Sequence, residues 1–279
     1  MRFPKYETRS LSDLRQHYIV EKEVASRFAK ASAVERRALY FQAYAELLER
    51  VPLHPHHTRK ADPRQSEQET IDKLRFLQPF LHLAATLLEV GAGNCALSLA
   101  AAAHVRHVYA LEVSEAVVHN VRSAKNLKVV ISDGCNVPVP DGSVDVAYSY
   151  QVMEHVHPDD AAQQLWNIYK ALSPAGRYIC ITPNRVSGPH DISQYFDPIA
   201  TGLHLHEYTW GELERLFLST GFSRVEAYVG LRNHYARLPI SLLRALEGCL
   251  WTLPRGFRRR VGNMRVFRNL LFISAVAVK

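Results

Sequence analysis

Two glycines stand at the end of an apolar run, in the segment Leu-Leu-Glu-Val-Gly-Ala-Gly that covers residues 87–93. A glycine turn after a strand lets a ligand approach the backbone, because no Cβ stands in the way. Glu112 follows Gly93 by 19 residues, the spacing at which an acid can hold ribose hydroxyls. The turn at Gly91, Ala92 and Gly93, taken with Glu112, therefore predicts a site for a ligand that carries an adenosine ribose.

Two further acids help to decide which ligand this is, since the turn fits a nicotinamide or flavin cofactor as well as S-adenosylmethionine. Glu89 lies two residues before the first glycine. A carboxylate there would oppose a pyrophosphate but suits a ligand with an ammonium and a sulfonium group. Asp133 and Gly134 follow a later β-rich run, where a carboxylate can accept a hydrogen bond from an adenine amino group. Both acids favour S-adenosylmethionine.

These residues lie at the ends of short β-rich runs that alternate with helical patterns from residue 85 onward. The expected strands cover residues 86–90, 108–113, 128–132, 144–150, 177–182, 225–229 and 270–278. The expected helices lie near residues 94–103, 114–123, 159–172 and 209–220. The alternation predicts βαβ units and a parallel sheet with helices on both faces. Sheets of this kind bind ligands beyond the carboxyl ends of their strands.

The first 84 residues are predicted to form a helical cap or lid over a core at residues 85–279. Residues 10–51 have a helical pattern, with Ser32 and Glu35 as a capping box. A further helix is expected at 67–83, after a proline-rich loop at 51–66. Three histidines of that loop have no acid close by in sequence, so we expect them to be surface residues: His54, His56 and His57.

The motifs follow one another in a fixed order along the chain. They are Glu-Val-Gly-Ala-Gly, an acid at the next strand end, Asp-Gly, Pro-Asp-Gly-Ser-Val-Asp, Val-Met-Glu-His-Val and Leu-Ser-Pro-Ala-Gly-Arg. This series resembles the class I S-adenosylmethionine-dependent methyltransferases, and most of all the bacterial branch with the ubiquinone- and menaquinone-biosynthesis enzymes. The resemblance covers about residues 85–230, and residues 270–278 are similar to the family's antiparallel last strand. Ala96 and Ala175 depart from frequent glycines of the family without removing the site.

The resemblance implies a Rossmann-like methyltransferase fold, which is an α/β, doubly wound, seven-stranded, mostly parallel sheet. It also implies roles for single residues. Glu89, Gly91, Ala92 and Gly93 would line the methionine end of S-adenosylmethionine, and Glu112 would bind the ribose. The remaining implied cofactor contacts are Val113 and Gly134 beside the adenine, Asp133 at its amino group, and Gln151 near the sulfonium.

Histidines near the expected strand ends are the candidate catalytic residues. Methyl transfer needs mainly alignment, but a hydroxyl acceptor benefits from a base that takes its proton. We predict His155, His190 and His206 as candidates, with His190 as the best single acceptor contact. On spacing alone, a metal set is also conceivable: His190, Asp191, His204, His206 and Glu207. No metal is expected, because His-x-His-Glu before a helix resembles a common non-metal segment of the branch.

Charge is concentrated in a segment before the last strand. The chain carries a net charge of +7 and a pI of about 9.3, which favours anionic partners. Residues 231–269 are predicted to be a helical basic insert, in which a leucine stripe precedes six arginines. This combination predicts peripheral contact with an anionic lipid or a lipid-linked substrate through residues 238–268. Nucleic acid is not expected, since no basic groove with exposed aromatics or known module is evident.

The expected function is methylation of a small-molecule acceptor, at a sugar, glycan, lipid-linked or natural-product hydroxyl. The alternatives are a nicotinamide-dependent oxidoreductase, a nucleic-acid methyltransferase and a non-catalytic, cofactor-binding partner subunit. Four scattered cysteines without a C-x-x-C pair, together with an N-terminus that lacks an apolar signal core, favour a cytoplasmic protein. Peripheral contact with a membrane fits the basic insert.

Overall fold

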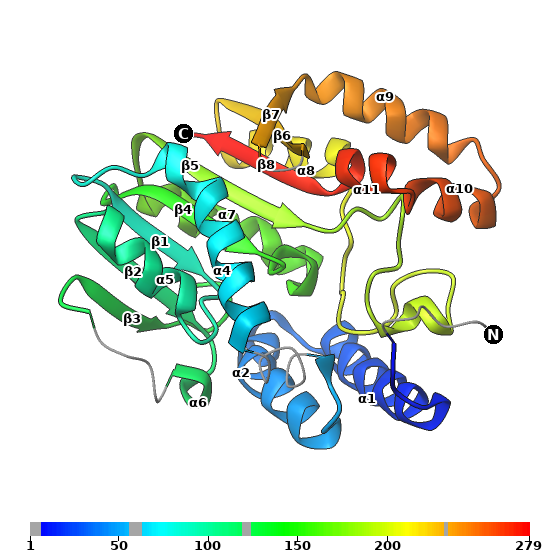
Figure 1. The fold of residues 1–279 in the computed structure, drawn as a ribbon. Helices are drawn as coiled ribbons and strands as arrows, with labels where there is room; N and C mark the ends of the chain where they lie inside the picture. The colour runs from blue at the N-terminus through cyan, green and yellow to red at the C-terminus, as the bar shows by residue number, and fades with distance from the viewer. Residues whose placement is uncertain (1–6, 56–62, 119–123, 232–233) are drawn as a thin grey trace.

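One eight-stranded sheet forms the centre of the molecule (Figure 1). The computed structural model describes residues 7–55, 63–118, 124–231 and 234–279. In sheet order the strands are β3 (Leu127–Ile131), β2 (His107–Glu112), β1 (Thr86–Val90), β4 (Val144–Tyr150), β5 (Leu172–Thr182), β8 (Ile273–Val278), β6 (Arg224–Leu231) and β7 (His234–Leu238). β1 to β5 pair in parallel, whereas β8 runs antiparallel to β5 and β6, and β7 runs antiparallel to β6. The predicted α/β sheet is confirmed, with one strand more than expected.

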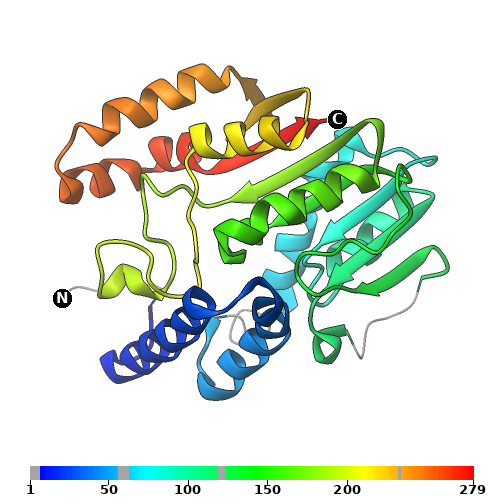
Figure 2. The same cartoon turned by 180° about the vertical axis from the view of Figure 1, so that it is seen from behind.

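Helices cover both faces of this sheet (Figures 1 and 2). One face carries α4 (Pro63–Leu77) and α5 (Ala96–Ala101), and the other carries α7 (Pro158–Ala171) and α8 (Trp210–Thr220). Successive residues of β1 join opposite cores, since Leu87 packs with α4 and α5 while Leu88 packs with α7 and α8. Burial on both faces explains the near-continuous apolar character of this strand.

Local sequence signals fix where the helices begin and end. Thr209 and Glu212 form a capping box before α8, and Gly221 ends that helix with a φ of 114°. The helix expected near residues 209–220 is therefore confirmed. The shorter helical pieces are η1 (Gln78–Phe80), η2 (Ala102–His104), α6 (Glu115–Val118), η3 (Met153–His155) and η4 (Ile192–Tyr195).

Two helices lie beyond the end of the sheet at which β1 ends (Figures 1 and 2), namely α1 (Leu11–Lys30) and α2 (Ala33–Arg50). The predicted capping box of Ser32 and Glu35 is present, and it divides the expected single helical stretch in two. α2 is fixed to α7 by a buried ion pair between Arg36 and Asp160, 2.6 Å long. These helices lie where the sequence places a cap. α4 instead packs on a face of the sheet, and the boundary at residue 84 stays a prediction.

The segment before the last strand is helical only in part. The prediction of a helical insert from residue 231 is wrong over β7, where Ala236 pairs with Val229 of β6. Hairpin pairing satisfies the backbone groups that β6 would otherwise leave open at the sheet edge. α9 (Ile240–Trp251), α10 (Arg255–Gly262) and α11 (Arg265–Leu271) follow, so the last strand begins at Ile273 and not at 270. In the part of the chain that the structure describes, no helix has the length and apolar character to cross a bilayer.

Candidate cofactor and acceptor site

The glycine turn joins the end of β1 to the end of β2. The N–H groups of Gly91 and Ala92 donate to the carbonyl oxygen of Leu111, at 2.8 and 3.0 Å. Gly91 has a φ of 73°, and a Cβ built on it would lie 2.5 Å from Cγ2 of Val152. Gly93 has a φ of 54° and open space beside it. The sequence therefore needs glycine at the first position both for the backbone and for packing.

Glu112 lies at this turn, as the sequence predicted for a ribose-binding acid. Its Oε2 accepts from the N–H of Gly93 at 2.7 Å, and its Oε1 accepts from the N–H of Val113 at 2.8 Å and of Ser114 at 3.2 Å. Three backbone donors thus fix the orientation of a half-buried carboxylate. A carboxylate held in this way can accept hydrogen bonds from a vicinal diol.

Glu89 is a buried carboxyl at the end of β1. Burial raises its pKa to about 7. The hydrogen bond that Oγ of Ser98 donates to Oε2 at 2.5 Å lowers the pKa but does not outweigh burial. A cationic group bound nearby would favour the charged carboxylate and offset part of the free-energy cost of its desolvation. The structure therefore fits an ammonium or sulfonium ligand better than a pyrophosphate at this position.

Asp133 and Gly134 are covered by α2. The Asp133 carboxylate accepts from the N–H groups of Cys135 and Asn136, from Nδ2 of Asn136, and from Nη1 of Arg37 at 2.6 Å. A Cβ on Gly134 would lie 2.6 Å from Cδ2 of Tyr40. All four lone-pair positions of Asp133 are filled, so an adenine amino group must displace one of these donors to bind there.

The last predicted cofactor contact, Gln151, follows β4 directly. Its N–H donates to the carbonyl oxygen of Ile181 at 2.7 Å, and its φ is 54°, in the left-handed region. The next residue, Val152, is the one that contacts Gly91. Gln151 and the glycine turn therefore border the same edge of the sheet, at the ends of β1 and β4.

The three predicted catalytic histidines lie in two different places. Nδ1 of His155 donates to the carbonyl oxygen of Leu203 at 2.9 Å, and its ring centroid is 4.9 Å from that of His204. His190 joins the same network, because its N–H donates to Oε1 of Glu207 at 2.6 Å. His206 lies apart from both, with Nε2 3.7 Å from the Glu212 carboxylate at the start of α8.

His204 and Glu207 are central to the network around His155. Nδ1 of His204 lies 2.8 Å from Oε1 of Glu207. Burial lowers the pKa of His204, but the neighbouring carboxylates of Glu207 and Glu154 outweigh it and raise the pKa to about 9. Burial and the nearby His204 lower the pKa of His155 to about 4. Spacing alone places His204 and Glu207 only in a metal set, and it does not single out Glu154.

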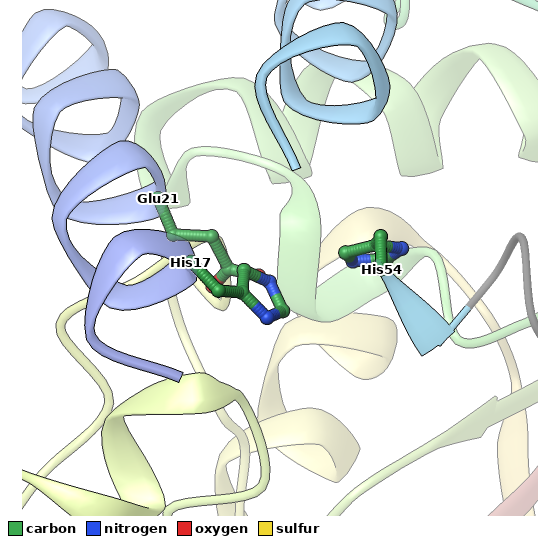
Figure 3. Close-up of side chains that lie close together, drawn as sticks. All are labelled: His17, Glu21 and His54. Atoms are coloured by element: carbon green, nitrogen blue, oxygen red, sulfur yellow. The ribbon is translucent and has the colours of Figure 1, made fainter. Parts of the chain in front are cut away.

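A second cluster lies between α1 and the turn after α2, and Figure 3 shows His17 and Glu21 side by side with His54 facing them. Nε2 of His17 is 2.7 Å from Oε1 of Glu21, and the ring centroids of His17 and His54 are 4.8 Å apart. The prediction of His54 as a surface residue without a nearby acid is wrong, because folding brings α1 against it. His56 and His57 lie outside the described residues.

Comparison with known proteins agrees with this geometry. Residues 88–180 match the family described as "Methyltransferase domain". A protein from Mycolicibacterium smegmatis named "Probable S-adenosylmethionine-dependent methyltransferase" is 34% identical over 147 residues, or 52% of this chain and 54% of that protein. A Mycobacterium tuberculosis protein with the same description is 30% identical over 180 residues, or 60% and 63% of the two chains. This chain thus spans less than two thirds of either relative.

The fold also matches solved structures. A chain from the complex between the Haloferax volcanii Trm112 methyltransferase activator and a methyltransferase superposes with a TM-score of 0.56. It is 17% identical and covers 78% of this chain and 94% of its own length. At this identity the likeness establishes the fold alone.

Proposed function

We propose that this chain, whose residues 88–180 belong to a class I S-adenosylmethionine-dependent methyltransferase domain, methylates a hydroxyl oxygen of a small-molecule acceptor. The observation that carries the proposal is the corner formed by the glycine turn, Glu89 and Glu112. It offers open space beside Gly93, a buried acid and an oriented acid in the order that this cofactor needs. Assignment to the quinone-biosynthesis branch stays a prediction.

The residues of this corner fit the cofactor. Glu89 would hold its ammonium end, the open space beside Gly93 would accommodate the methionine chain, and Glu112 would bind the ribose hydroxyls. When bound, S-adenosylmethionine supplies an electrophilic methyl group on its sulfonium. The protein then has to align the acceptor with that methyl group and exclude water.

The acceptor is expected on the side of His155, next to Gln151 and beneath α1 and α2. Side chains with polar groups line this region, which favours a hydroxylated acceptor over an apolar one. His206 points toward Glu212, and Nε2 of His190 already donates to the carbonyl oxygen of Asn184 at 3.0 Å. Of the three predicted histidines, His155 is therefore the one that we assign to acceptor activation.

Calorimetric titration of the purified chain tests the cofactor assignment. S-adenosylhomocysteine should bind with one site per chain, and a nicotinamide dinucleotide should not bind. Glu112→Gln should weaken binding, since a neutral amide is a poorer acceptor for two hydroxyl groups. Binding of the nicotinamide dinucleotide in place of S-adenosylhomocysteine would favour the oxidoreductase alternative. Methyl transfer to nucleic acid and not to glycans or lipid-linked glycans would favour the nucleic-acid alternative.

A basic and apolar surface on α10 and α11 favours a membrane-associated acceptor. The predicted leucine stripe of α9 contributes little to it, because Leu243 and Leu250 are buried against the core and Leu242 alone of its leucines is exposed in the described chain. The exposed apolar side chains are instead Trp251, Phe257, Met264 and Val266. The exposed arginines among them are Arg255, Arg260, Arg265 and Arg268.

None of these four arginines forms an ion pair with another described residue, and residues 251–272 contain no acid. Unpaired cations beside exposed aromatic and aliphatic side chains complement an anionic lipid surface. α10 also contacts the loop after β5, since Nη1 of Arg259 donates to the carbonyl oxygen of Gln194 and Nδ2 of Asn263 to that of Ser187. This surface therefore adjoins the acceptor side, and we propose that it docks on anionic lipid.

Co-sedimentation with vesicles tests this surface. The chain should bind vesicles of anionic phospholipid and remain in solution with vesicles of neutral phospholipid only. Equal partition with both vesicle types, or binding to nucleic acid in place of anionic vesicles, would overturn the lipid assignment.

A further inference from the structure

Three side chains beside the expected acceptor converge as metal ligands do. They are Glu154 and His155 of η3 and His204 of the segment before α8. One potential ligand atom from each lies within 4.8 Å of those of the other two. η3 follows β4 closely, so Glu154 and His155 lie three and four residues beyond Gln151, and folding brings His204 against them.

His155 and His204 each form a hydrogen bond through Nδ1, so Nε2 is the nitrogen that a metal would bind in both rings. The carbonyl oxygen of Leu203 can only accept, so Nδ1 of His155 carries the proton and Nε2 keeps its lone pair. Nδ1 of His204 faces the Glu207 carboxylate, so Nε2 of His204 is the atom left for a metal, which would displace the proton that this histidine carries there at neutral pH. A carbonyl or carboxylate behind Nδ1 is the usual outer support of a metal-binding histidine.

The third ligand atom is a buried oxygen without a partner. Glu154 is fully buried, and its Oε2 accepts from Oγ1 of Thr182 at 2.9 Å. Its Oε1 has no hydrogen-bond partner among the described residues. Leaving a buried carboxylate oxygen unsatisfied costs about 1–3 kcal/mol, and a bound cation would remove that cost.

The surroundings carry excess negative charge. Four buried carboxylates lie in this region, and none of them forms an ion pair with a lysine or arginine of the described chain: Glu21, Glu154, Asp191 and Glu207. Within the described chain, Glu21 is paired with His17 and Glu207 with His204. A divalent cation would offset this charge better than protonated imidazole does.

The neighbouring cluster of His17, Glu21 and His54 has potential ligand atoms equally close together. Its hydrogen bonds, however, do not leave Nε2 of His17 available for a metal. Nη1 of Arg9 lies 2.8 Å from Nδ1 of His17 and can only donate. Nδ1 of His17 must therefore accept, and Nε2 carries the proton that it gives to Glu21. A metal at Nε2 would require this ring to lose the Arg9 bond, so the cluster in Figure 3 serves as a matched control.

We propose that Oε1 of Glu154 and the Nε2 atoms of His155 and His204 bind a divalent transition-metal ion of the zinc class. Two nitrogens and one carboxylate oxygen suit such an ion and leave a coordination position open. That the open position receives the acceptor hydroxyl rests on the proposed function. There the ion would lower the pKa of the hydroxyl, whose O–H bond would break with its proton passing to water. The oxygen would keep that electron pair and attack the methyl carbon as the methyl–sulfur bond breaks, with the sulfur keeping the bond's electrons and leaving as S-adenosylhomocysteine.

Metal titration of the chelator-treated full chain, with Zn²⁺ as the probe and calorimetry as the readout, tests the site. We expect one Zn²⁺ per chain. His204→Ala and Glu154→Gln should abolish this binding, and Glu207→Gln should weaken it about 10–100-fold by removing the support of His204. His17→Ala and His54→Ala should bind Zn²⁺ like the unaltered chain. Circular dichroism and S-adenosylhomocysteine titration of each variant would confirm that it is folded.

Three results would overturn the metal site. They are no Zn²⁺ binding by the folded chain, binding that survives in Glu154→Gln and His204→Ala, and binding that is lost in His17→Ala instead. Zn²⁺ binding without S-adenosylhomocysteine binding would contradict the proposed function while leaving the metal site in place. S-adenosylhomocysteine binding without Zn²⁺ binding would do the reverse, so the two proposals fail separately.

Discussion

At the scale of single residues, we expect Glu89 to make cofactor binding depend on pH. Burial raises its pKa to about 7, so the carboxyl is protonated in the free protein under mildly acidic conditions. A cationic ligand group needs the anion, and the affinity for S-adenosylhomocysteine should fall as pH decreases below about 7. Glu89→Gln should weaken binding at pH 8 by about 2 kcal/mol, or about 30-fold, and flatten this pH profile. Titrations from pH 6 to 8 would check it, and an unchanged profile would exclude Glu89 from the site.

The same carboxyl should destabilise the fold as pH rises. Its pKa is about 7 in the folded chain against an ordinary value of 4.5, so between these values the folded state binds more protons than the unfolded state. Stability therefore falls with rising pH across this window, by up to about 3 kcal/mol from this group. Glu89→Gln stays neutral and should gain stability relative to the unaltered chain between pH 5 and 8. Urea unfolding at both pH values measures the difference, and a constant difference would contradict the assigned pKa.

The two turn glycines should respond differently to a methyl group. Gly91→Ala meets both a left-handed backbone and a Cβ contact of 2.5 Å with Val152, whereas Gly93→Ala meets the backbone cost alone. The latter should cost about 1–2 kcal/mol, and Gly91→Ala should cost more. Adding Val152→Ala should remove the packing part of the Gly91→Ala effect, corrected for the cost of Val152→Ala alone. Chemical unfolding of the four variants tests this, and equal costs at both glycines would contradict the packing argument.

The residues of the proposed cofactor site could be predicted from the sequence because their signals are local. Gly91, Gly93 and Glu112 sit at strand ends that hydrophobic alternation locates, and parallel strands bring such ends together. Glu154 and His204 lie 50 residues apart, and their meeting depends on the path of the loop after β5. Nothing in the spacing reveals that Leu203 and Glu207 fix the two imidazole rings. The occupation of Asp133 by Arg37 is equally non-local, since the two residues are 96 positions apart.

At the scale of elements, the strands were the most predictable and the segment before the last strand the least. β1 and β4 agree with their predicted bounds, because both are apolar runs bounded by turn residues. β7 was missed because His-Tyr-Ala-Arg-Leu alternates weakly, and its strand character comes from pairing with β6. Tertiary pairing thus overrides a weak local preference at this sheet edge.

A buried ion pair contributes to the attachment of α2 to the core. Arg36 donates to both carboxylate oxygens of Asp160, and both side chains are buried. Arg36→Ala leaves Asp160 without its cation and should lower the free energy of unfolding by about 3–5 kcal/mol. Hydrogen exchange should also increase in α2 before it does in β1. The exposed pair of Arg27 and Glu46 is the control, and Arg27→Ala should cost at most about 1 kcal/mol. Equal costs for the two variants would contradict this role.

At the scale of the whole molecule, the surface of α10 and α11 should make membrane binding depend on salt. Each arginine near an anionic bilayer contributes about 1 kcal/mol, so exchanging Arg255, Arg260 and Arg265 together for glutamine should weaken vesicle binding about 100-fold. Binding by the unaltered chain should also fall between 0.05 and 0.5 M salt as the Debye length shortens from roughly 14 to 4 Å.

The controls for this surface separate charge from apolar contact. Phe257→Ser should weaken vesicle binding and leave its salt dependence unchanged. The reason is that it removes exposed apolar area that a bilayer would bury, and no charge. A second triple variant exchanges exposed arginines of α1, α2 and α4 for glutamine, and two of them are paired with acids: Arg15, Arg50 and Arg75. This variant carries the same net charge as the first triple variant and should bind vesicles like the unaltered chain. An equal loss in the two triple variants would show that net charge, and not the α10–α11 surface, attracts the lipid.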